Sequence, residues 1–368
     1  DISRGWKSAS DAAHALVHEF LRVGPIEIGL SPQGVCALSV IEEGLATPSD
    51  TAAPVLPCEL FIVSGGARGV TAEVAIAIAK AWRPRIVILG RSSLPTDEPE
   101  WLAPLLTENV IRQTLISRAP AGTLPRSIEL QLRQILAERE VAVSLSLLRA
   151  TGAQIVYRSV DVRDQAVLRA LISNLQREFG PVRGLIHGAG VLADGRIEDK
   201  TRDQFDRVFE TKVSGLRNLL GSIDPDDLRV LCVFSSYTAR YGRVGQSDYA
   251  MANEVLNKMS LQFAIQHPKA KVISFNWGPW NGGMVTQSLK AIFAAEGVGL
   301  IPMADGAELL VRELTQTPSR SVERMVIGKF EASSSLNSMA YQPGQATFEG
   351  QQSTLGIGLN PPLATALQ

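Results

Sequence analysis

Two hydroxyl residues near the middle of the chain could together reduce a carbonyl group. Ser236 ends an apolar run that is typical of a buried strand, and Tyr249 follows it by thirteen residues at the start of a helical pattern. Reduction of a ketone requires hydride on one face, a hydrogen-bond donor to the developing oxyanion, and a proton. The pair therefore predicts a site at which a carbonyl is polarised and protonated.

The cation that such a tyrosine needs is expected from a neighbouring helix. A phenol has a pKa of about 10, and a nearby ammonium stabilises the phenolate and lowers that pKa. Asn253 lies one helical turn after Tyr249 but carries no charge, and Lys258 falls on the opposite side of the helix. Lys212 stands on or beside the buried face of the preceding helical pattern, where a lysine is costly unless its head reaches a polar group. We therefore expect Lys212 and Asn253 to exchange the usual positions of lysine and asparagine.

The glycine-rich stretch "SGGARGVT" follows a strand pattern and precedes a helical one. Gly65 and Gly69 permit a tight turn and a close approach of backbone to pyrophosphate, which the helix N-terminus then faces with free N–H groups. A plain strand-to-helix turn could contain the same glycines, but the place of this loop at the head of an α/β pattern favours nucleotide binding. Thr71 replaces the usual last glycine, so helix and strand are expected slightly further apart. The contacts expected from this stretch are Ser64, Gly65, Gly66, Arg68, Gly69 and Val70.

The end of the second strand selects the cofactor. Enzymes that use NAD place an acidic residue there for the ribose 2′-hydroxyl, whereas a basic residue accommodates the 2′-phosphate of NADP. The sequence "LGRSS" provides Arg91 and Ser92 and no carboxylate, which favours NADPH, although a solvated surface arginine would look the same. Asp161 could accept from the adenine amino group, and Val162 could cover the ring. Small residues that let the ribose and nicotinamide approach are Gly188, Ala189 and Gly190.

Strands and helices alternate along most of the chain. Near-continuous apolar strands between helices indicate a parallel sheet that is covered on both faces. We expect strands at residues 59–66, 85–90, 154–162, 182–190, 228–236, 271–278 and 324–330. We expect helices at Thr71–Ala81, Asp164–Phe179, Thr201–Ile223 and Tyr249–His267. The fold class is therefore α/β, a Rossmann-type doubly wound parallel sheet with a helical insertion and a small N-terminal β-containing structural segment.

The alternation also divides the chain into domains. Residues 1–57 are expected to form the N-terminal structural segment and a linker, and residues 58–330 the nucleotide-binding catalytic domain. About residues 94–150 of that domain form the helical insertion, because one helix would suffice between the two strands that flank it. Residues 331–368 are polar and without period, which predicts a disordered linker.

Local signals mark the ends of helices and turns in these segments. Ser10 or Asp11 is expected to cap the first helix, and two short strands are expected around the turn signal "SPQG". The long helix of the insertion is expected to run from a cap near Thr123 to a C-terminal Gly152.

The composition excludes several classes of protein. The chain has 368 residues and a net charge of −1, which gives no global field for nucleic acid or an anionic membrane. No apolar run is long enough to span a bilayer, and four scattered histidines make a structural metal site improbable. Cys36, Cys58 and Cys232 are expected to be buried free thiols, which indicates a reducing, cytoplasmic location. The start at Asp1 and the polar tail suggest a piece of a longer protein.

The motifs "SGGARGVT", "LGRSS", "VDVRD", "HGAGVL", "TKVSGLRNLL", "FSSYTARYGRVGQSDYAMAN" and "NWGPW" occur in this order. Over about residues 58–330 the chain resembles the ketoreductase domains of polyketide and fatty acid synthases, which are extended short-chain dehydrogenases/reductases. Lys212, Ser236, Tyr249 and Asn253 match the catalytic tetrad of that family with the lysine and asparagine exchanged. The glycine loop and the insertion are most similar to those of polyunsaturated-fatty-acid-synthase-type enzymes.

The resemblance implies a reaction, a cofactor and partners. The family reduces a 3-ketoacyl thioester with NADPH while the phosphopantetheine arm of an acyl carrier protein holds the acyl chain. Neighbouring synthase domains are the other implied partners, and residues 1–57 would be a remnant of the family's structural half.

The resemblance also implies where the acyl chain binds. Members that give the D-hydroxyl product carry Leu-Asp-Asp after the fourth strand, and Leu192-Ala193-Asp194 here favours that product. The segment 277–303 is expected to form a lid over the acyl chain, lined by Met284, Leu289, Ile292 and Phe293, although a plain amphipathic helix has the same spacing. The residues expected to contact the substrate are Leu192, Asp194, Gln246, Trp280 and Met284.

Two other functions fit parts of this pattern. A catalytically silent scaffold domain would organise its neighbours, but such domains lose the tyrosine or the glycine loop, and this chain retains both. A free-standing reductase of small ketones would share the motifs, but the non-Met start, the extra N-terminal segment and the trailing linker argue against it. A packed strand–loop–helix with surface hydroxyls is the non-catalytic interpretation of Ser236 and Tyr249.

Overall fold

The chain divides into two units. The structure, a computed structural model, describes residues 5–24, 28–42, 53–93, 98–316 and 321–328. The large unit is Ser49–Phe330, and the small unit combines residues 1–48 with 331–368. The C-terminal linker expected at residues 331–368 lies outside the described residues.

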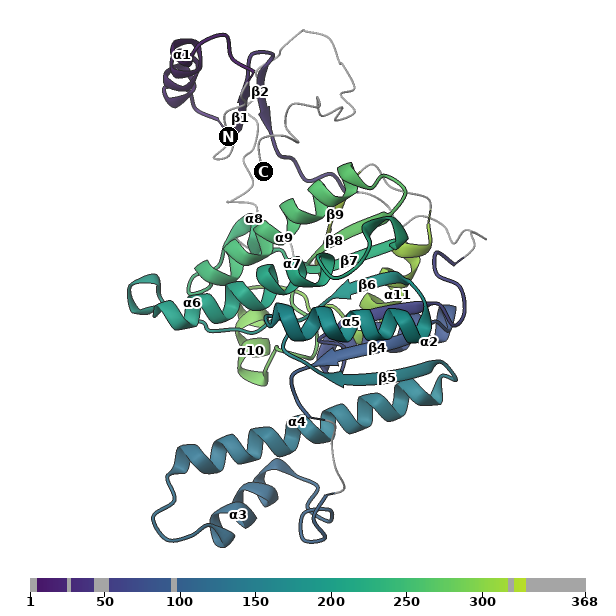
Figure 1. Cartoon of the computed structure of the whole chain (residues 1–368). Coiled ribbons are helices and arrows are strands. Elements are labelled where there is room, and N and C mark those ends of the chain that lie inside the picture. Colours follow the sequence, from purple (N-terminus) through teal and green to yellow (C-terminus); the bar gives the residue numbers. More distant parts are fainter. Residues whose placement is uncertain (1–4, 25–27, 43–52, 94–97, 317–320, 329–368) are drawn as a thin grey trace. The chain divides into compact units, whose positions relative to one another are not determined.

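Seven parallel strands form the sheet of the large unit, in the order β5-β4-β3-β6-β7-β8-β9 (Figure 1). The order reverses between β3 and β6, and in doubly wound sheets ligands bind at the carboxyl end of such a switch point. The expected α/β fold is confirmed, and each expected strand is present. The strands are β3 Leu60–Ser64, β4 Arg85–Gly90, β5 Gln154–Ser159, β6 Val182–His187, β7 Val230–Ser236, β8 Lys271–Trp277 and β9 Glu323–Val326.

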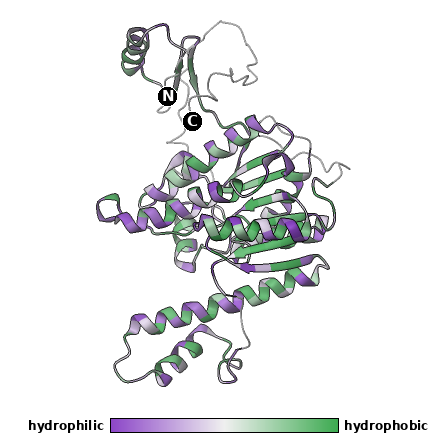
Figure 2. Ribbon diagram, in the orientation of Figure 1, coloured by the Kyte–Doolittle hydropathy of each residue, from purple (hydrophilic) through white to green (hydrophobic). Residues whose placement is uncertain are grey.

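The two faces of the sheet carry separate hydrophobic cores. On one face Phe61 and Val63 of β3 pack in a core with α2 and α11, and on the other face Leu60 and Ile62 pack in a core with α5, α7 and α9. Successive residues of a strand point to opposite faces, so a strand between two cores is apolar throughout. Figure 2 shows this hydrophobic sheet between helices of mixed character. The helices are α2 Gly69–Trp82, α5 Gln165–Phe179, α7 Gly215–Leu220, α9 Ser247–Gln266 and α11 Met303–Thr315.

Three of the four expected helices are single elements, namely α2, α5 and α9. Asp164 caps α5, because its carboxylate accepts a hydrogen bond of 3.1 Å from the N–H of Val167. Helix α11 occupies a stretch in which no element was expected.

The fourth expected helix, Thr201–Ile223, is not continuous. Helix α6, Arg202–Phe209, runs into a π-helical turn at Glu210–Ser214, and α7 follows that turn. The prediction of one regular helix is therefore wrong at this turn. A single π turn changes the hydrophobic spacing too little to be recognised from periodicity, and such turns are frequent at functional sites.

Helix α4, Pro125–Ala150, is the long helix expected in the insertion, and it belongs to two cores. Val141, Leu145 and Leu148 in its C-terminal half pack into the core on the α2 face. That half is therefore the crossover helix between β4 and β5. The N-terminal half forms a second core with α3, Glu108–Arg118, and with the segment before it. Hereafter "the arm" means residues 98–139, which hold this second core.

Proline and glycine define the two ends of α4. The N-cap of the helix is Leu124, next to Thr123 and so near the expected position, and Pro125 takes the first helical position, where its fixed φ is favourable. The Thr123 hydroxyl donates instead to the carbonyl of Pro120, at 2.7 Å. At the other end Gly152 adopts a φ of +79°, as a helix-terminating glycine does.

The described part of the small unit contains one helix and one hairpin, as expected from its sequence. The helix begins earlier than expected: Ser8 caps it by accepting a hydrogen bond of 3.1 Å from the N–H of Asp11, so a cap at Ser10 or Asp11 is wrong. The elements are α1 Ala9–Phe20, β1 Ile28–Ser31 and β2 Gly34–Ala37, and the two strands pair antiparallel around "SPQG".

The cysteines are free thiols, but only one of them is buried. Cys232 lies within β7, whereas Cys36 and Cys58 are exposed. The predicted burial is wrong for Cys36 because every residue of β2 is exposed, and for Cys58 because it lies in a left-handed turn before β3 with a φ of +65°.

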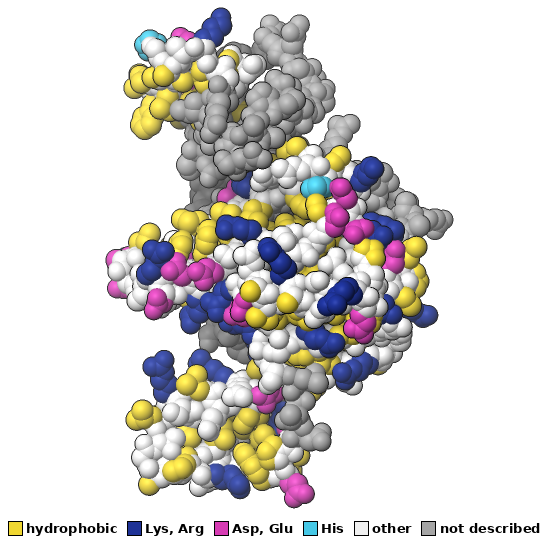
Figure 3. Space-filling model, viewed as in Figure 1, with side chains coloured by type: hydrophobic (Ala, Val, Ile, Leu, Met, Phe, Trp, Pro, Cys, Tyr) yellow, Lys and Arg dark blue, Asp and Glu magenta, His cyan; other side chains and the backbone are white. Residues whose placement is uncertain are grey.

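Charged side chains of both signs are mixed on the surface of the described residues. Figure 3 shows Lys and Arg interspersed with Asp and Glu over the visible face. None of the helices in the described parts of the chain has the length and apolarity of a transmembrane span. Those parts also contain no group of three or more His, Cys, Asp or Glu side chains that could hold a metal ion.

The assignment of the C-terminal half of α4 to the main core predicts unequal effects of two adjacent substitutions. Leu148→Ala removes a fully buried side chain and should lower the free energy of unfolding by about 2–5 kcal/mol. Leu147→Ala changes a side chain that is 52% exposed and should stay within about 0.5 kcal/mol of wild type. Urea denaturation measures both, and equal effects would contradict the assignment.

Candidate active site

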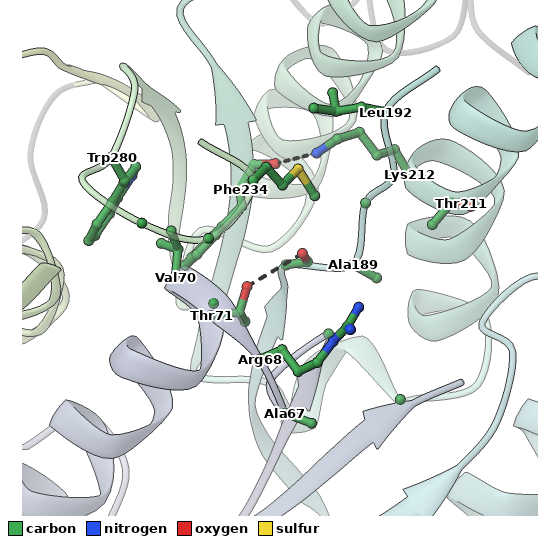
Figure 4. Close-up of a pocket in the computed structure, with 18 of the residues that line it drawn as sticks. Ala67, Arg68, Val70, Thr71, Ala189, Leu192, Thr211, Lys212, Phe234 and Trp280 are labelled. Atoms are coloured by element: carbon green, nitrogen blue, oxygen red, sulfur yellow. Dashed lines mark hydrogen bonds between the residues drawn. The ribbon is translucent and has the colours of Figure 1, made fainter. Parts of the chain in front are cut away.

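A cleft of about 800 Å³ opens at the carboxyl edge of the sheet (Figure 4). The loops after β3, β4, β6, β7 and β8 line it, together with the π turn and the start of α9. This is the switch-point edge at which ligands bind in doubly wound sheets. Figure 4 shows Arg68 extending into the cleft, with Lys212 reaching towards Phe234 on its far side.

Glycines let the loop after β3 approach its neighbours. Gly65 has a φ of +75°, and a Cβ there would lie 2.9 Å from the backbone of Ala189. Gly69 has a φ of +58°, and a Cβ there would lie 3.2 Å from the Cα of Gly283. Both glycines are therefore required by geometry, and the loop passes directly into the N-terminus of α2. This is the arrangement that receives a pyrophosphate.

Thr71 stands where a glycine is usual at the end of the loop, and Gly188 after β6 provides the space for it. The Thr71 hydroxyl faces the carbonyl of Gly188 at 3.5 Å, and a Cβ on Gly188 would lie 2.5 Å from the Thr71 side chain. The close contact of helix and strand is thus made possible by the glycine on the β6 side.

Basic and hydroxyl groups gather at the end of β4. Arg91 and Arg68 are both exposed and line the cleft, and Ser92 lines it beside the first of them. The Tyr157 hydroxyl donates to the carbonyl of Ser92 at 2.6 Å and fixes the turn. Asp161, expected at the adenine, forms an ion pair with Arg163 at 2.7 Å, and this ion pair keeps the pKa of the Asp161 carboxyl below its usual value.

Lys212 is almost completely buried, with 3% of its surface exposed. Its Nζ donates to the carbonyl of Phe234 at 2.9 Å and lies 5.2 Å from the centroid of the Tyr249 ring. Burial lowers the pKa of this amine to about 7, because water no longer solvates the charged form. The lysine therefore points into the site, next to the tyrosine, and not towards bulk water.

A buried histidine that entered the sequence-based expectations only as part of "HGAG" supports this lysine. His187 ring Nε2 lies 2.9 Å from the carbonyl of Lys212, and Nδ1 lies 2.7 Å from the hydroxyl of Ser64. Burial, and then the nearby Lys212, lower the His187 pKa to about 3, so the ring is neutral near pH 7. A Cβ at Gly215 would lie 3.1 Å from the ring, so this glycine lets the π turn pack against it.

The two hydroxyls of the expected pair are both at the cleft. Ser236 is buried at the end of β7, and its hydroxyl accepts a hydrogen bond of 3.0 Å from that of Thr238. Tyr249 lies in the first turn of α9, and burial raises its pKa to about 12. A phenol in this state needs a positive charge close by before it can release a proton near neutral pH.

Asn253 lies behind Tyr249 rather than on the cleft wall. Its side-chain amide donates to the carbonyl of Tyr249 at 2.8 Å, and its own backbone carbonyl accepts from the Ser235 hydroxyl at 3.1 Å. Its side-chain oxygen is buried and has no partner among the described residues. Asn253 therefore ties the first turn of α9 to the end of β7.

The loop after β6 is attached to the start of α9 beside Tyr249. A buried ion pair joins Lys200 to Asp248 at 2.8 Å, and the other Asp248 oxygen accepts from the Tyr249 N–H at 2.8 Å. The side chain of Gln246 donates to Asp194 at 3.0 Å. Both contacts hold the loop that contains Leu192 against the helix that carries the tyrosine.

The segment after β8 supplies the apolar end of the cleft. Trp280, Met284, Leu289 and Phe293 line it, the last two from α10, Gln287–Ala295. Ile292, expected to line the lid, is not among the lining residues, because it lies on another side of α10 and is 46% exposed.

The structure thus brings most of the expected site residues to one cleft and leaves a few behind its wall. Gly66 faces the core against Val63, Ser64 bonds His187, and Asp161 pairs with Arg163. Asp194 and Asn253 bond the lining residues Gln246 and Tyr249. The expected residues that line the cleft are Gly65, Arg68, Gly69, Val70, Arg91, Ser92, Val162, Gly188, Ala189, Gly190, Leu192, Lys212, Ser236, Gln246, Tyr249, Trp280 and Met284.

The sequence did not predict that helix α4 lines part of the cleft. Helix α4 of the insertion lines the cleft near the glycine loop, although the spacing of its residues gives no indication of a position there. Its lining residues are Gln134, Ala137, Glu138, Glu140 and Val141.

The strand order and the glycine loop define a Rossmann-type, doubly wound α/β fold, the class of fold that binds dinucleotides, and solved ketoreductases share it. The family model of the KR domain matches residues 60–282. The chain belongs to this family, the ketoreductase domains of polyketide and polyunsaturated fatty acid synthases.

Three relatives illustrate the similarity. One chain of the polyunsaturated fatty acid synthase of Thraustochytrium sp. is 36% identical over 319 residues, which is 82% of this chain but only 11% of that protein. The ketoreductase from the first module of phoslactomycin biosynthesis in Streptomyces sp. has the same fold, with a TM-score of 0.64 at 23% identity over 85% of this chain and 62% of that one. An archaeal alcohol dehydrogenase from Thermococcus sibiricus, complexed with 5-hydroxy-NADP, shares the fold at a TM-score of 0.53 and 15% identity, over 73% of this chain and 97% of that one.

Because Lys212 is buried, replacing it with an uncharged residue should raise the free energy of unfolding by an amount that depends on pH. The amine has a pKa of about 7 in the folded protein, against an ordinary value of 10.5. Between pH 7 and pH 10.5 the unfolded chain therefore binds more protons than the folded one. The free energy of unfolding of wild type consequently rises with pH over this range. Methionine does not titrate. The stability of Lys212→Met relative to wild type should therefore be greatest at and below pH 7 and decline by about 1.4 kcal/mol per pH unit towards pH 10.

Paired urea denaturation of the two proteins at pH 6.5, 8 and 9.5 measures this difference. Lys258→Met, which removes a half-exposed lysine on the opposite side of α9, is the control for the loss of a lysine as such. A difference between Lys212→Met and wild type that stays constant over this range would show that the amine is not desolvated.

Proposed function

We propose that this chain reduces a 3-ketoacyl thioester, carried on an acyl carrier protein, to the 3-hydroxyacyl thioester with NADPH. One observation carries the proposal: a buried lysine lies against the ring of Tyr249, in the same cleft as the hydroxyl of Ser236 and a glycine loop suited to pyrophosphate. An oxidoreductase of the KR domain family needs these groups together, and the segment after β8 gives the cleft an apolar surface.

The residues present fit a dinucleotide that carries a 2′-phosphate. Gly65 and Gly69 leave room for the pyrophosphate at the N-terminus of α2, whose first turn contains no acidic residue. Arg91 and Arg68 are exposed, line the cleft and can face a phosphate at the end of β4. When bound, NADPH would supply the hydride. The fold neighbour complexed with 5-hydroxy-NADP supports a nicotinamide cofactor of this type.

The side chains of the chain itself polarise and protonate the ketone. The Ser236 hydroxyl donates a hydrogen bond to the carbonyl oxygen, and the Tyr249 hydroxyl donates the proton as negative charge develops there. Lys212 holds its amine beside the phenol and, as an ammonium, opposes the effect of burial on the Tyr249 pKa. Asn253 and Asp248 hold the backbone of Tyr249, so that its hydroxyl stays aimed into the cleft.

The substrate assignment depends on the wall after β8 and on the relatives. Met284, Leu289 and Phe293 offer apolar surface to an acyl chain, and the matched region of the Thraustochytrium synthase is a small part of a much longer protein. We accordingly assign an acyl carrier protein and neighbouring synthase domains as partners. We likewise assign residues 1–57 as a remnant of the structural half of such domains.

Tyr249→Phe tests the proposed proton donor. With NADPH and a short 3-ketoacyl thioester surrogate, wild type should oxidise NADPH and form the 3-hydroxy product, which chiral chromatography identifies. The variant should lose at least about 100-fold in rate, the usual contribution of a positioned acid, while it binds NADPH as wild type does. Tyr237→Phe, which removes another phenol from the same cleft, should keep most of the activity.

Two results would contradict different parts of the proposal. An active Tyr249→Phe variant would mean that another group delivers the proton. A wild-type chain that binds NADPH but reduces no 3-ketoacyl thioester would support the silent-scaffold function instead.

Arg91→Asp tests the cofactor assignment. The aspartate should repel a 2′-phosphate and accept a hydrogen bond from a ribose 2′-hydroxyl, so we expect the preference for NADPH over NADH to fall at least about tenfold, equivalent to 1.4 kcal/mol. The ratio of kcat/KM values for the two cofactors measures it. An unchanged ratio would remove Arg91 from the 2′-phosphate site.

A further inference from the structure

The insertion contributes a carboxylate to the part of the cleft that should receive a pyrophosphate. The N–H of Gly69, the first residue of α2, donates a hydrogen bond of 2.9 Å to the Oε1 of Glu140 on α4. The two residues are 71 positions apart in the chain, and both line the cleft.

Helix α2 has no other side-chain partner at this end. Arg68 occupies its N-cap position and forms no side-chain cap hydrogen bond, and the first turn contains no acidic residue. The helix N-terminus is a region of positive potential whose amides seek an anion. Among the described residues, Glu140 is therefore the anionic side chain that accepts a hydrogen bond from the N–H of Gly69.

A cofactor pyrophosphate and the Glu140 carboxylate would compete for the same donor. The Gly69 N–H can point at only one oxygen at hydrogen-bond distance, and a negative charge held beside it repels a second one. Gly69 cannot move away easily, because its φ of +58° and its contact with Gly283 fix the turn.

The position of Glu140 is tied to the arm. Its neighbour Arg139 forms an ion pair with Glu98 at 2.6 Å and donates to the carbonyls of Leu105 and Leu102 at 2.5 and 2.9 Å. On its other side, Val141 is buried in the main core. Glu140 thus lies at the boundary between the part of α4 that packs on the sheet and the part that packs in the arm.

We propose that Glu140 takes the place of the cofactor pyrophosphate at the N-terminus of α2 and so sets how tightly the chain holds its dinucleotide. Binding of the dinucleotide displaces the carboxylate, and the carboxylate returns to the Gly69 N–H when the oxidised cofactor leaves. The insertion is then part of the cofactor site and lowers its affinity. This inference rests on the proposed function in so far as the cleft binds NADPH.

Glu140→Gln in the full chain tests the inference, with Glu138→Gln as the matched control. Glu138 is on the same helix, lines the same cleft and carries the same charge, but bonds Gln134 at 2.9 Å rather than α2. Glu140→Gln should lower the Kd for NADPH about tenfold in a fluorescence titration, whereas Glu138→Gln should stay within about twofold. Inorganic pyrophosphate should likewise inhibit NADPH binding at lower concentration in Glu140→Gln than in wild type.

The melting temperature without nucleotide separates this role from that of a simple helix cap. We expect Glu140→Gln to melt at or below the wild-type temperature although it binds NADPH more tightly. A variant that loses both stability and affinity, or whose affinity is unchanged, would overturn the inference and leave the proposed function intact. Equal tightening in both variants would also overturn it, because that result indicates a general charge effect. If neither wild type nor variant binds NADPH, the proposed function fails and the inference fails with it.

Discussion

The desolvation of a single amine is the constraint on which the site depends. Lys212 lies in the interior beside Tyr249, and the protein gives its nitrogen one carbonyl, that of Phe234, in exchange for the water it has lost. Such a group is costly for a stable fold, yet it is what a buried phenol requires if it is to act as an acid. The surrounding structure is best understood as the means of keeping that amine in place.

The supports come from four parts of the chain that meet at the sheet edge. The π turn presents Lys212, and the neutral ring of His187 bridges the carbonyl of this turn to Ser64 at the end of β3. Because the same strand end leads into the glycine loop, one short chain of hydrogen bonds connects the lysine with the part of the cleft beside that loop. A neutral His187 suits this position, since a second positive charge beside Lys212 would favour loss of the proton from the amine.

Much of this could be predicted from the sequence, because the signals were local. Apolar runs indicated the parallel strands, and Lys212 was recognisable as a charge within an apolar stripe. The π turn was not predictable, because five residues of altered geometry leave the pattern of apolar positions almost unchanged. Glu140 was missed for another reason: its contact with Gly69 joins residues far apart in the chain, and only the packing of α4 against the core brings them together. Exposure of Cys36 likewise depends on what covers a strand, which its neighbours in sequence do not reveal.

The near contact between Gly69 and Gly283 has a consequence for how such domains diversify. Both residues have a positive φ, and a Cβ on Gly69 would lie 3.2 Å from the Cα of Gly283, so side chains are disfavoured at both positions and the start of the segment after β8 follows the shape of the glycine loop. The apolar lining of the cleft is freer to change further along the chain, at Met284, which is 46% exposed, and in α10. Substitutions there leave the backbone of the glycine loop unchanged.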